Sequence, residues 1–87
     1  MDWDSYSFVI SSEYRKKILK ALESRPKTPT ELKNETGYYL SHISTTLKEL
    51  EEKSLVTCLT PRRRKGKLFQ LDESGQAIVN KLSKYKL

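Results

Sequence analysis

Apolar side chains recur at helical spacing in the segment that follows Ser12. The repeating positions are Tyr14, Ile18, Leu19 and Leu22. This spacing places them on one face of a helix, while the basic residues between them fall on other faces. Either Ser11 or Ser12 can cap this helix, with Glu13 in its first turn, and we predict that it ends before Pro26.

The sequence TPTE at residues 28–31 predicts the start of a second helix. The Thr28 hydroxyl can accept a hydrogen bond from the Glu31 amide, and the Glu31 carboxylate can reach back to the Thr28 amide. Pro29 occupies the first helical position, where its missing N–H costs nothing. We expect this helix to be short and to end at Gly37 in the left-handed conformation.

A third amphipathic helix is predicted after this glycine. Its apolar stripe consists of Leu40, Ile43, Leu47 and Leu50, spaced three, four and three residues apart. The opposite face carries Ser41, His42, Thr45, Lys48 and Glu49. The acidic residues of this helix all lie in its second half, so an anionic partner can approach only its first half.

The remaining pattern predicts a hairpin and a fourth helix. Residues 55–59 and 67–71 are rich in branched and aromatic side chains and flank a cationic turn, which favours two antiparallel strands. Asp72 can cap a last helix. The apolar side chains along one side of that helix are Ala77, Ile78, Leu82 and Tyr85. Residues 1–10 are too apolar for a free tail, and we expect them to pack against another segment.

The predicted order is helix, helix, helix, hairpin, helix, which is mainly α with a small β-hairpin. It resembles the winged helix-turn-helix, with a three-helix core, a two-stranded wing and a C-terminal helix. The segments SSEYRKKIL, TPTELKNETG, LSHISTTLKELEEKSLV and FQLDESG are similar, in order, to parts of the small regulators of the ArsR and MarR type. We expect one domain over 1–87, with an apolar N-terminal segment (1–10), a winged-helix core (11–71) and a C-terminal helix (72–87).

Two positions depart from the pattern of this family. Tyr39 stands where a small capping residue is usual, and Ser54 replaces the usual glycine before Leu55. Metal-sensing members carry two thiolates in the recognition helix, whereas the helix predicted here has none. We therefore expect no metal and no cofactor, and the sequence identifies no small-molecule effector.

The distribution of charge points to a polyanionic partner. The chain has 87 residues, with 17 Lys and Arg against 11 Asp and Glu. Residues 1–52 hold eight basic and nine acidic side chains, while residues 53–87 hold nine and two. There is neither a membrane-length apolar stretch nor a signal peptide, so we expect a cytoplasmic protein without a membrane partner. The single cysteine, Cys58, cannot form an internal disulfide.

The resemblance implies that the third helix enters the major groove of DNA while the hairpin tip lies on the backbone or in the minor groove. The candidate recognition-helix residues are Tyr39, Ser41, His42, Thr45 and Lys48. The candidate wing residues are Arg62, Arg63, Arg64, Lys65 and Lys67. Gly66 permits the turn between the strands.

Other interpretations of these residues stay open. The basic hairpin can be a solvated turn, and His42 an ordinary surface histidine. For Cys58 we favour a buried apolar role over a redox switch. The apolar residues assigned to a possible dimer surface are Leu59, Leu68, Trp3, Tyr6 and Tyr85. Alternatively, residues 1–10 cover the two leucines within one subunit.

We predict sequence-specific binding of double-stranded DNA by a homodimeric transcription regulator. The alternative is a winged-helix module that binds protein or RNA without reading DNA sequence. An enzyme is not expected, because the sequence has no paired carboxylates, no Ser/His/Asp set and no glycine-rich phosphate loop.

Overall fold

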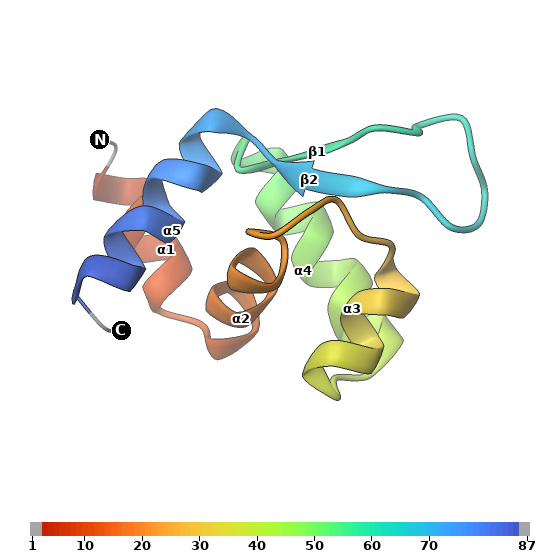
Figure 1. Cartoon of the computed structure of the whole chain (residues 1–87), viewed down its shortest axis with the longest axis horizontal. Helices are drawn as coiled ribbons and strands as arrows, with labels where there is room; N and C mark the ends of the chain where they lie inside the picture. Colours follow the sequence, from red (N-terminus) through yellow and green to blue (C-terminus); the bar gives the residue numbers. More distant parts are fainter. Residues whose placement is uncertain (1–2, 86–87) are drawn as a thin grey trace.

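The computed structural model describes residues 3–85, apart from the side chain of Tyr85, and contains five helices and one hairpin. The elements are α1 (Trp3–Ile10), α2 (Glu13–Ala21), α3 (Pro29–Thr36), α4 (Leu40–Glu52), β1 (Val56–Cys58), β2 (Phe69–Leu71) and α5 (Glu73–Tyr85). Helices α1 and α5 lie side by side at one end of the molecule, and the loop between β1 and β2 projects at the other end (Figure 1). The predicted fold class, a winged helix-turn-helix, is confirmed.

The element order differs from the prediction in one helix. Residues 3–10 form α1, whereas the sequence pattern predicted only an apolar segment there. The expectation that this segment packs on the rest of the chain is confirmed, because Val9 is buried and Tyr6 is only 7% exposed. Tyr6 therefore belongs to the core and not to an exposed dimer surface. Tyr85, which was assigned to the same surface, has a side chain outside the described part of the structure.

Helices α2, α3 and α4 pack against one another around the core. The buried apolar side chains that they contribute are Ile18, Leu19, Leu32, Ile43, Leu47 and Leu50. The predicted starts and stops of these helices are present. The Ser12 hydroxyl caps α2, both hydrogen bonds of the capping box at Thr28 form, and Gly37 ends α3 with φ of 77°.

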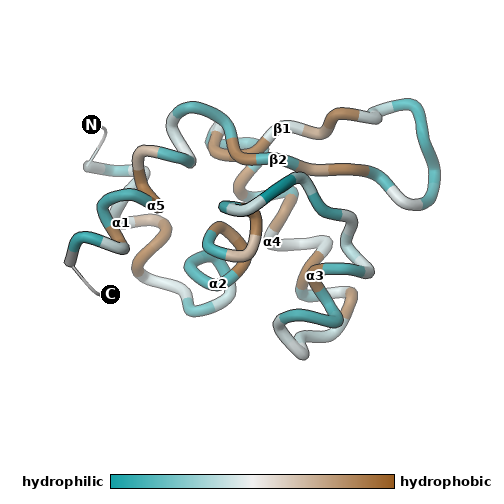
Figure 2. The backbone as a smooth tube through the Cα atoms, viewed as in Figure 1, coloured by the Kyte–Doolittle hydropathy of each residue, from teal (hydrophilic) through white to brown (hydrophobic). Residues whose placement is uncertain are grey.

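The two strands are shorter than predicted. They pair with each other, and β2 also pairs with a third segment of the chain. Val56 pairs with Leu71, and Cys58 with Phe69, in antiparallel register. Lys27, in the link between α2 and α3, exchanges two backbone hydrogen bonds of 2.9 Å with Phe69. The base of the hairpin is thereby tied to the start of α3. Along the hairpin, the hydrophobic colour gives way to hydrophilic at the tip (Figure 2).

The C-terminal end of α4 is closed by Ser54, which has φ of 59°. Its amide donates to the Glu51 carbonyl, and the Leu55 amide donates to the Leu50 carbonyl. This is the hydrogen-bond pattern of a Schellman motif, in which the left-handed position normally holds glycine. The buried side chains of Leu50 and Leu55 complete the motif. The departure noted at Ser54 therefore falls on a backbone position that is unfavourable for serine.

Helix α5 closes the core from the side opposite α3. Its buried side chains are Ile78, Val79 and Leu82. The prediction for Ala77 is wrong, since Ala77 is exposed and Val79 takes the buried position. Gly75 in the first turn is required by close packing, because a Cβ atom there would overlap the carbonyl group of Leu55.

Candidate nucleic-acid interface

A short turn connects α3 to α4 and sets how α4 is presented. The turn runs from Gly37 to Tyr39, and the Gly37 amide still donates to the Lys33 carbonyl at 2.8 Å. Tyr39 is the N-cap of α4, and its side chain makes no capping hydrogen bond. Two helices joined by so short a turn are typical of the helix-turn-helix.

One face of α4 is buried and the other is open. The buried residues of α4 are Ile43, Thr46, Leu47 and Leu50. The prediction that Leu40 joins them is wrong, because Leu40 is 45% exposed. Leu40 is the first residue of the helix. Thr46 is buried in addition to the predicted residues.

The predicted polar residues of α4 lie on its open face. Ser41, His42, Thr45 and Lys48 are all exposed, as is Tyr39 at the N-cap. Ser44 is also exposed and was missed, although its place three residues after Ser41 and four before Lys48 would have indicated it. The side chains of Tyr39, Ser41, His42, Ser44 and Thr45 can both donate and accept hydrogen bonds, whereas the Lys48 ammonium only donates.

The open face of α4 is bordered by two hollows. On the side of α2, a hollow of about 290 Å³ is lined by Tyr14, His42 and Thr45, among others. On the side of the hairpin, a hollow of about 420 Å³ is lined by Ser44, Lys48, Arg64 and Lys67, among others. Recognition-helix and hairpin candidates therefore meet in the second hollow.

The hairpin tip presents its cations to solvent. Arg62, Arg63, Arg64 and Lys65 are exposed, and Lys67 is half-buried. Within residues 3–84, no carboxylate forms an ion pair with any of these five side chains. The turn is shaped locally by Gly66, with φ of 67°, whose carbonyl accepts a hydrogen bond of 3.4 Å from the Arg63 guanidinium. The basic charge of the tip is thus available to an external anion.

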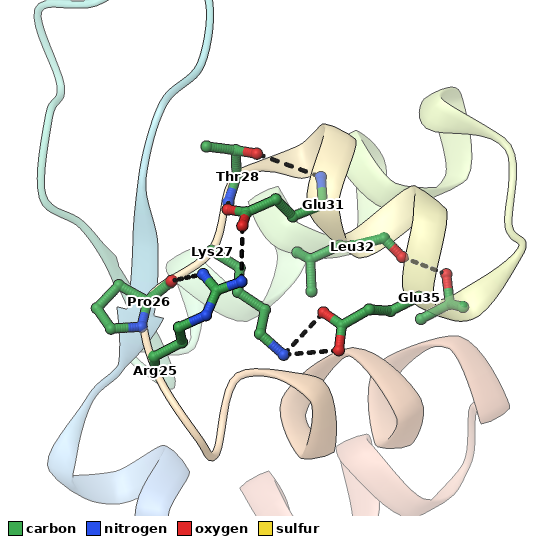
Figure 3. Close-up of polar contacts among 8 residues, drawn as sticks. Arg25, Pro26, Lys27, Thr28, Glu31, Leu32 and Glu35 are labelled. Carbon is green, nitrogen blue, oxygen red and sulfur yellow. Dashed lines mark hydrogen bonds and ion pairs between the residues drawn. The ribbon is translucent and has the colours of Figure 1, made fainter.

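A cluster of ion pairs fixes the base of the hairpin to α3 (Figure 3). The Lys27 ammonium, whose side chain is 5% exposed, lies 2.7 Å from the Glu35 carboxylate. Arg25 reaches Glu31 at 2.7 Å. The Arg25 guanidinium, followed by the Thr28 amide, lowers the pKa of Glu31 to about 2. Because Lys27 also pairs with β2, these contacts set the position of the wing relative to the helices.

The described residues contain no cluster of three or more His, Cys, Asp or Glu side chains able to hold a metal ion. Nor do they include a helix with the length and apolar character needed to cross a bilayer. Cys58 is half-buried and packs against the core.

Several solved structures, including those of MarR, BigR and ZitR, are similar to this fold. The reduced form of MarR from E. coli gives a TM-score of 0.78 at 26% identity, covering 93% of this chain and 61% of MarR. The transcriptional repressor BigR from Xylella fastidiosa gives 0.75 at 23%, covering 94% and 80%. ZitR from Lactococcus lactis gives 0.76 at 18%, covering 86% and 52%, so this chain spans about half the length of ZitR.

The sequence of the chain matches the family model for bacterial regulatory proteins of the arsR family over residues 12–57. This range is more than half of the 87 residues and runs from the N-cap of α2 into β1. A comparison with curated proteins gives no match. The chain belongs to the ArsR family of bacterial regulatory proteins, and its fold is that of transcriptional regulators and not of enzymes.

Proposed function

We propose that the chain acts as one domain that binds double-stranded DNA and regulates transcription as a homodimer in the cytoplasm. Helix α4 lies in the major groove, and the hairpin tip follows the phosphate backbone or the minor groove beside it. The observation that carries this proposal is the cationic tip, whose arginines and lysines have no carboxylate partner in residues 3–84. A phosphate backbone supplies the missing negative charge.

The two parts of the surface have different tasks. Ser41, His42 and Thr45 project from α4 with hydrogen-bonding groups that can discriminate base edges. Tyr39 and Lys48 flank them, Lys48 as a phosphate contact. The phosphate contacts of the wing are Arg62, Arg63, Arg64, Lys65 and Lys67. We expect the helix to supply sequence preference and the wing to supply general affinity.

Exposed apolar residues support the homodimer. Trp3 on α1 is 61% exposed, and Leu59 beyond β1 is open to solvent as well. A single winged helix reads only a short half-site, and two-fold pairing joins two half-sites into a longer operator. Sedimentation at micromolar concentration should give a dimer for the native chain and a smaller species for Trp3→Asp. A native monomer would contradict the dimer without affecting the assignment of the DNA surface.

Selection of bound sequences from a random duplex pool tests the central proposal. We expect one enriched pseudo-palindrome. On that site, His42→Ala or Thr45→Ala should cost roughly 1–3 kcal/mol and should cost much less on random DNA. Alanine at Arg62, by contrast, should weaken both complexes by similar factors. No enriched sequence, or equal losses on both DNAs for the α4 variants, would favour a module that binds without reading sequence.

A further inference from the structure

Four aromatic rings form a row that leads from the core to the exposed start of α4. Tyr38 contacts Tyr14 with ring centroids 4.5 Å apart, Tyr14 contacts His42 at 5.0 Å, and His42 contacts Tyr39 at 5.9 Å. All three contacts are edge-to-face, the arrangement that aromatic pairs prefer. We call these four residues the aromatic row.

The row is anchored at one end and open at the other. Tyr38 is half-buried and packs against the hydrophobic core. Tyr39, at the far end, is 75% exposed, and its side chain makes no capping hydrogen bond to α4. The neighbouring Leu40 is exposed as well, so a small apolar patch stands at the start of an otherwise polar surface. Tyr39 and Leu40 are adjacent in the chain and form a contiguous apolar site rimmed by polar side chains, unlike apolar residues that are exposed singly.

The charges around this patch restrict what can cover it. No acidic residue occurs between Tyr38 and Lys48, and the cationic wing lies beyond Ser44 and Lys48. Glu49, which lines the hollow beside Tyr14 and His42, is paired with Arg15. The surroundings therefore favour a polyanion over a protein surface of mixed charge. In the major groove of DNA, the apolar group presented by the bases is the C5 methyl of thymine.

We propose that Tyr39 contacts the methyl group of a thymine in each operator half-site. The edge-to-face contact with His42 restricts the Tyr39 ring, so less conformational entropy is lost when the methyl contact forms. Tyr14 acts one step further back as a positioning residue, because it contacts His42 and Tyr38 but lies on α2. This inference rests on the proposed function, and it adds the chemical group that the start of α4 reads.

A scan with deoxyuridine tests the contact without changing the protein. Deoxyuridine lacks only the C5 methyl group and keeps the base-pairing and hydrogen-bonding groups of thymine. Each thymine of the selected operator is replaced in turn, and the dissociation constant of the native chain is measured. Replacing thymine at one position per half-site should lower the affinity about fourfold, because the complex then buries one methyl group fewer.

Variants then assign that loss to the row. Tyr39→Ala should bind thymine and deoxyuridine operators equally, whereas Tyr39→Phe keeps the ring and should retain the fourfold preference. Tyr14→Ala should reduce the preference, and Tyr14→Phe should restore it. The preference is the ratio of two affinities of the same protein, so it does not depend on the fraction of that protein that is folded. Thermal melting checks separately that each variant folds.

Three results would overturn the inference alone. The methyl contact is contradicted if the selected operator has no thymine in the half-site. It is also contradicted if the deoxyuridine scan shows no loss at any position of a strongly preferred operator. The proposed function stands in both cases. Tyr39→Ala with an undiminished preference for thymine removes the role of the row. Absence of any preferred operator would instead defeat the proposed function itself, and this inference with it.

Discussion

The Arg15 guanidinium on α2 donates two hydrogen bonds to the Glu49 carboxylate on α4, each with a nitrogen–oxygen distance of 3.3 Å. The same guanidinium donates to the Phe8 carbonyl at the end of α1 at 2.8 Å. It also lies 3.7 Å from the centre of the Phe8 ring. One side chain thus joins α1, α2 and α4, and it neutralises an acidic residue that would otherwise stand near the proposed DNA surface.

Replacing Arg15 should therefore destabilise the whole helical core. We expect Arg15→Ala to lower the free energy of unfolding by about 1–2 kcal/mol, since it removes a partly exposed ion pair, a carbonyl partner and packing on an aromatic ring. Chemical denaturation measures the change. Arg15→Lys should recover only part of it, because an ammonium cannot form the forked contact. An unchanged stability in both variants would show that the contact contributes nothing.

The wing arginines should control the salt dependence of DNA binding. Alanine at Arg62, Arg63 or Arg64 removes one phosphate contact, and each such change should flatten the slope of log affinity against log salt by about 0.9. A titration of the triple variant from low to moderate salt measures the combined effect. Helix α5 lies at the end of the molecule opposite the wing (Figure 1), and Lys84 is in its last turn. Lys84→Ala removes one positive charge there and is the control for each single arginine variant. Equal slopes for the native chain and the triple variant would contradict the wing assignment.

Ser54 offers a direct route to higher stability. Its φ of 59° costs a side chain about 1–2 kcal/mol, whereas glycine adopts it freely but loses more entropy on folding. The net effect of Ser54→Gly should be a gain of about 0.5–1 kcal/mol in the free energy of unfolding, measured by denaturation. Ser24→Gly, at an exposed position without positive φ, should give no gain. A loss of stability in Ser54→Gly would contradict this account.

Glu31 should make the stability of the start of α3 depend on acidic pH. Arg25, and then the Thr28 amide, lower the pKa of Glu31 from 4.5 to about 2 in the folded chain. Because the pKa of Glu31 is lower in the folded chain than in the unfolded chain, ionised Glu31 stabilises the fold. This stabilisation is complete above about pH 4.5 and is lost as the pH falls towards 2. The difference in stability between the native chain and Glu31→Gln should therefore shrink over that interval in denaturation experiments.

The arginine supplies the control for this titration. In an Arg25→Gln background the largest cause of the shift is absent, so Glu31→Gln should produce a weaker pH dependence between pH 4.5 and 2. The same pH dependence in both backgrounds would show that the Arg25 contact does not govern the titration of Glu31.

The sequence alone was sufficient to predict those structural features whose determining residues lie close together in the chain. The capping box at Thr28 and the left-handed Gly37 involve residues within one helical turn, so the limits of α3 could be predicted. Helical periodicity alone likewise placed Ser41, His42 and Thr45 on the open face of α4. The cationic hairpin followed from two short β-forming segments on either side of a glycine turn.

Tertiary structure decided what depends on groups far apart in the chain. Lys27 joins the sheet through Phe69, a pairing that no pattern around Lys27 indicates. Helix α1 has only eight residues, and its helical form is supported by burial of Tyr6 and Val9 in a core assembled from distant segments. Leu40 matches the periodicity of α4 yet remains exposed, because periodicity gives a direction from the helix axis and not the presence of a partner there.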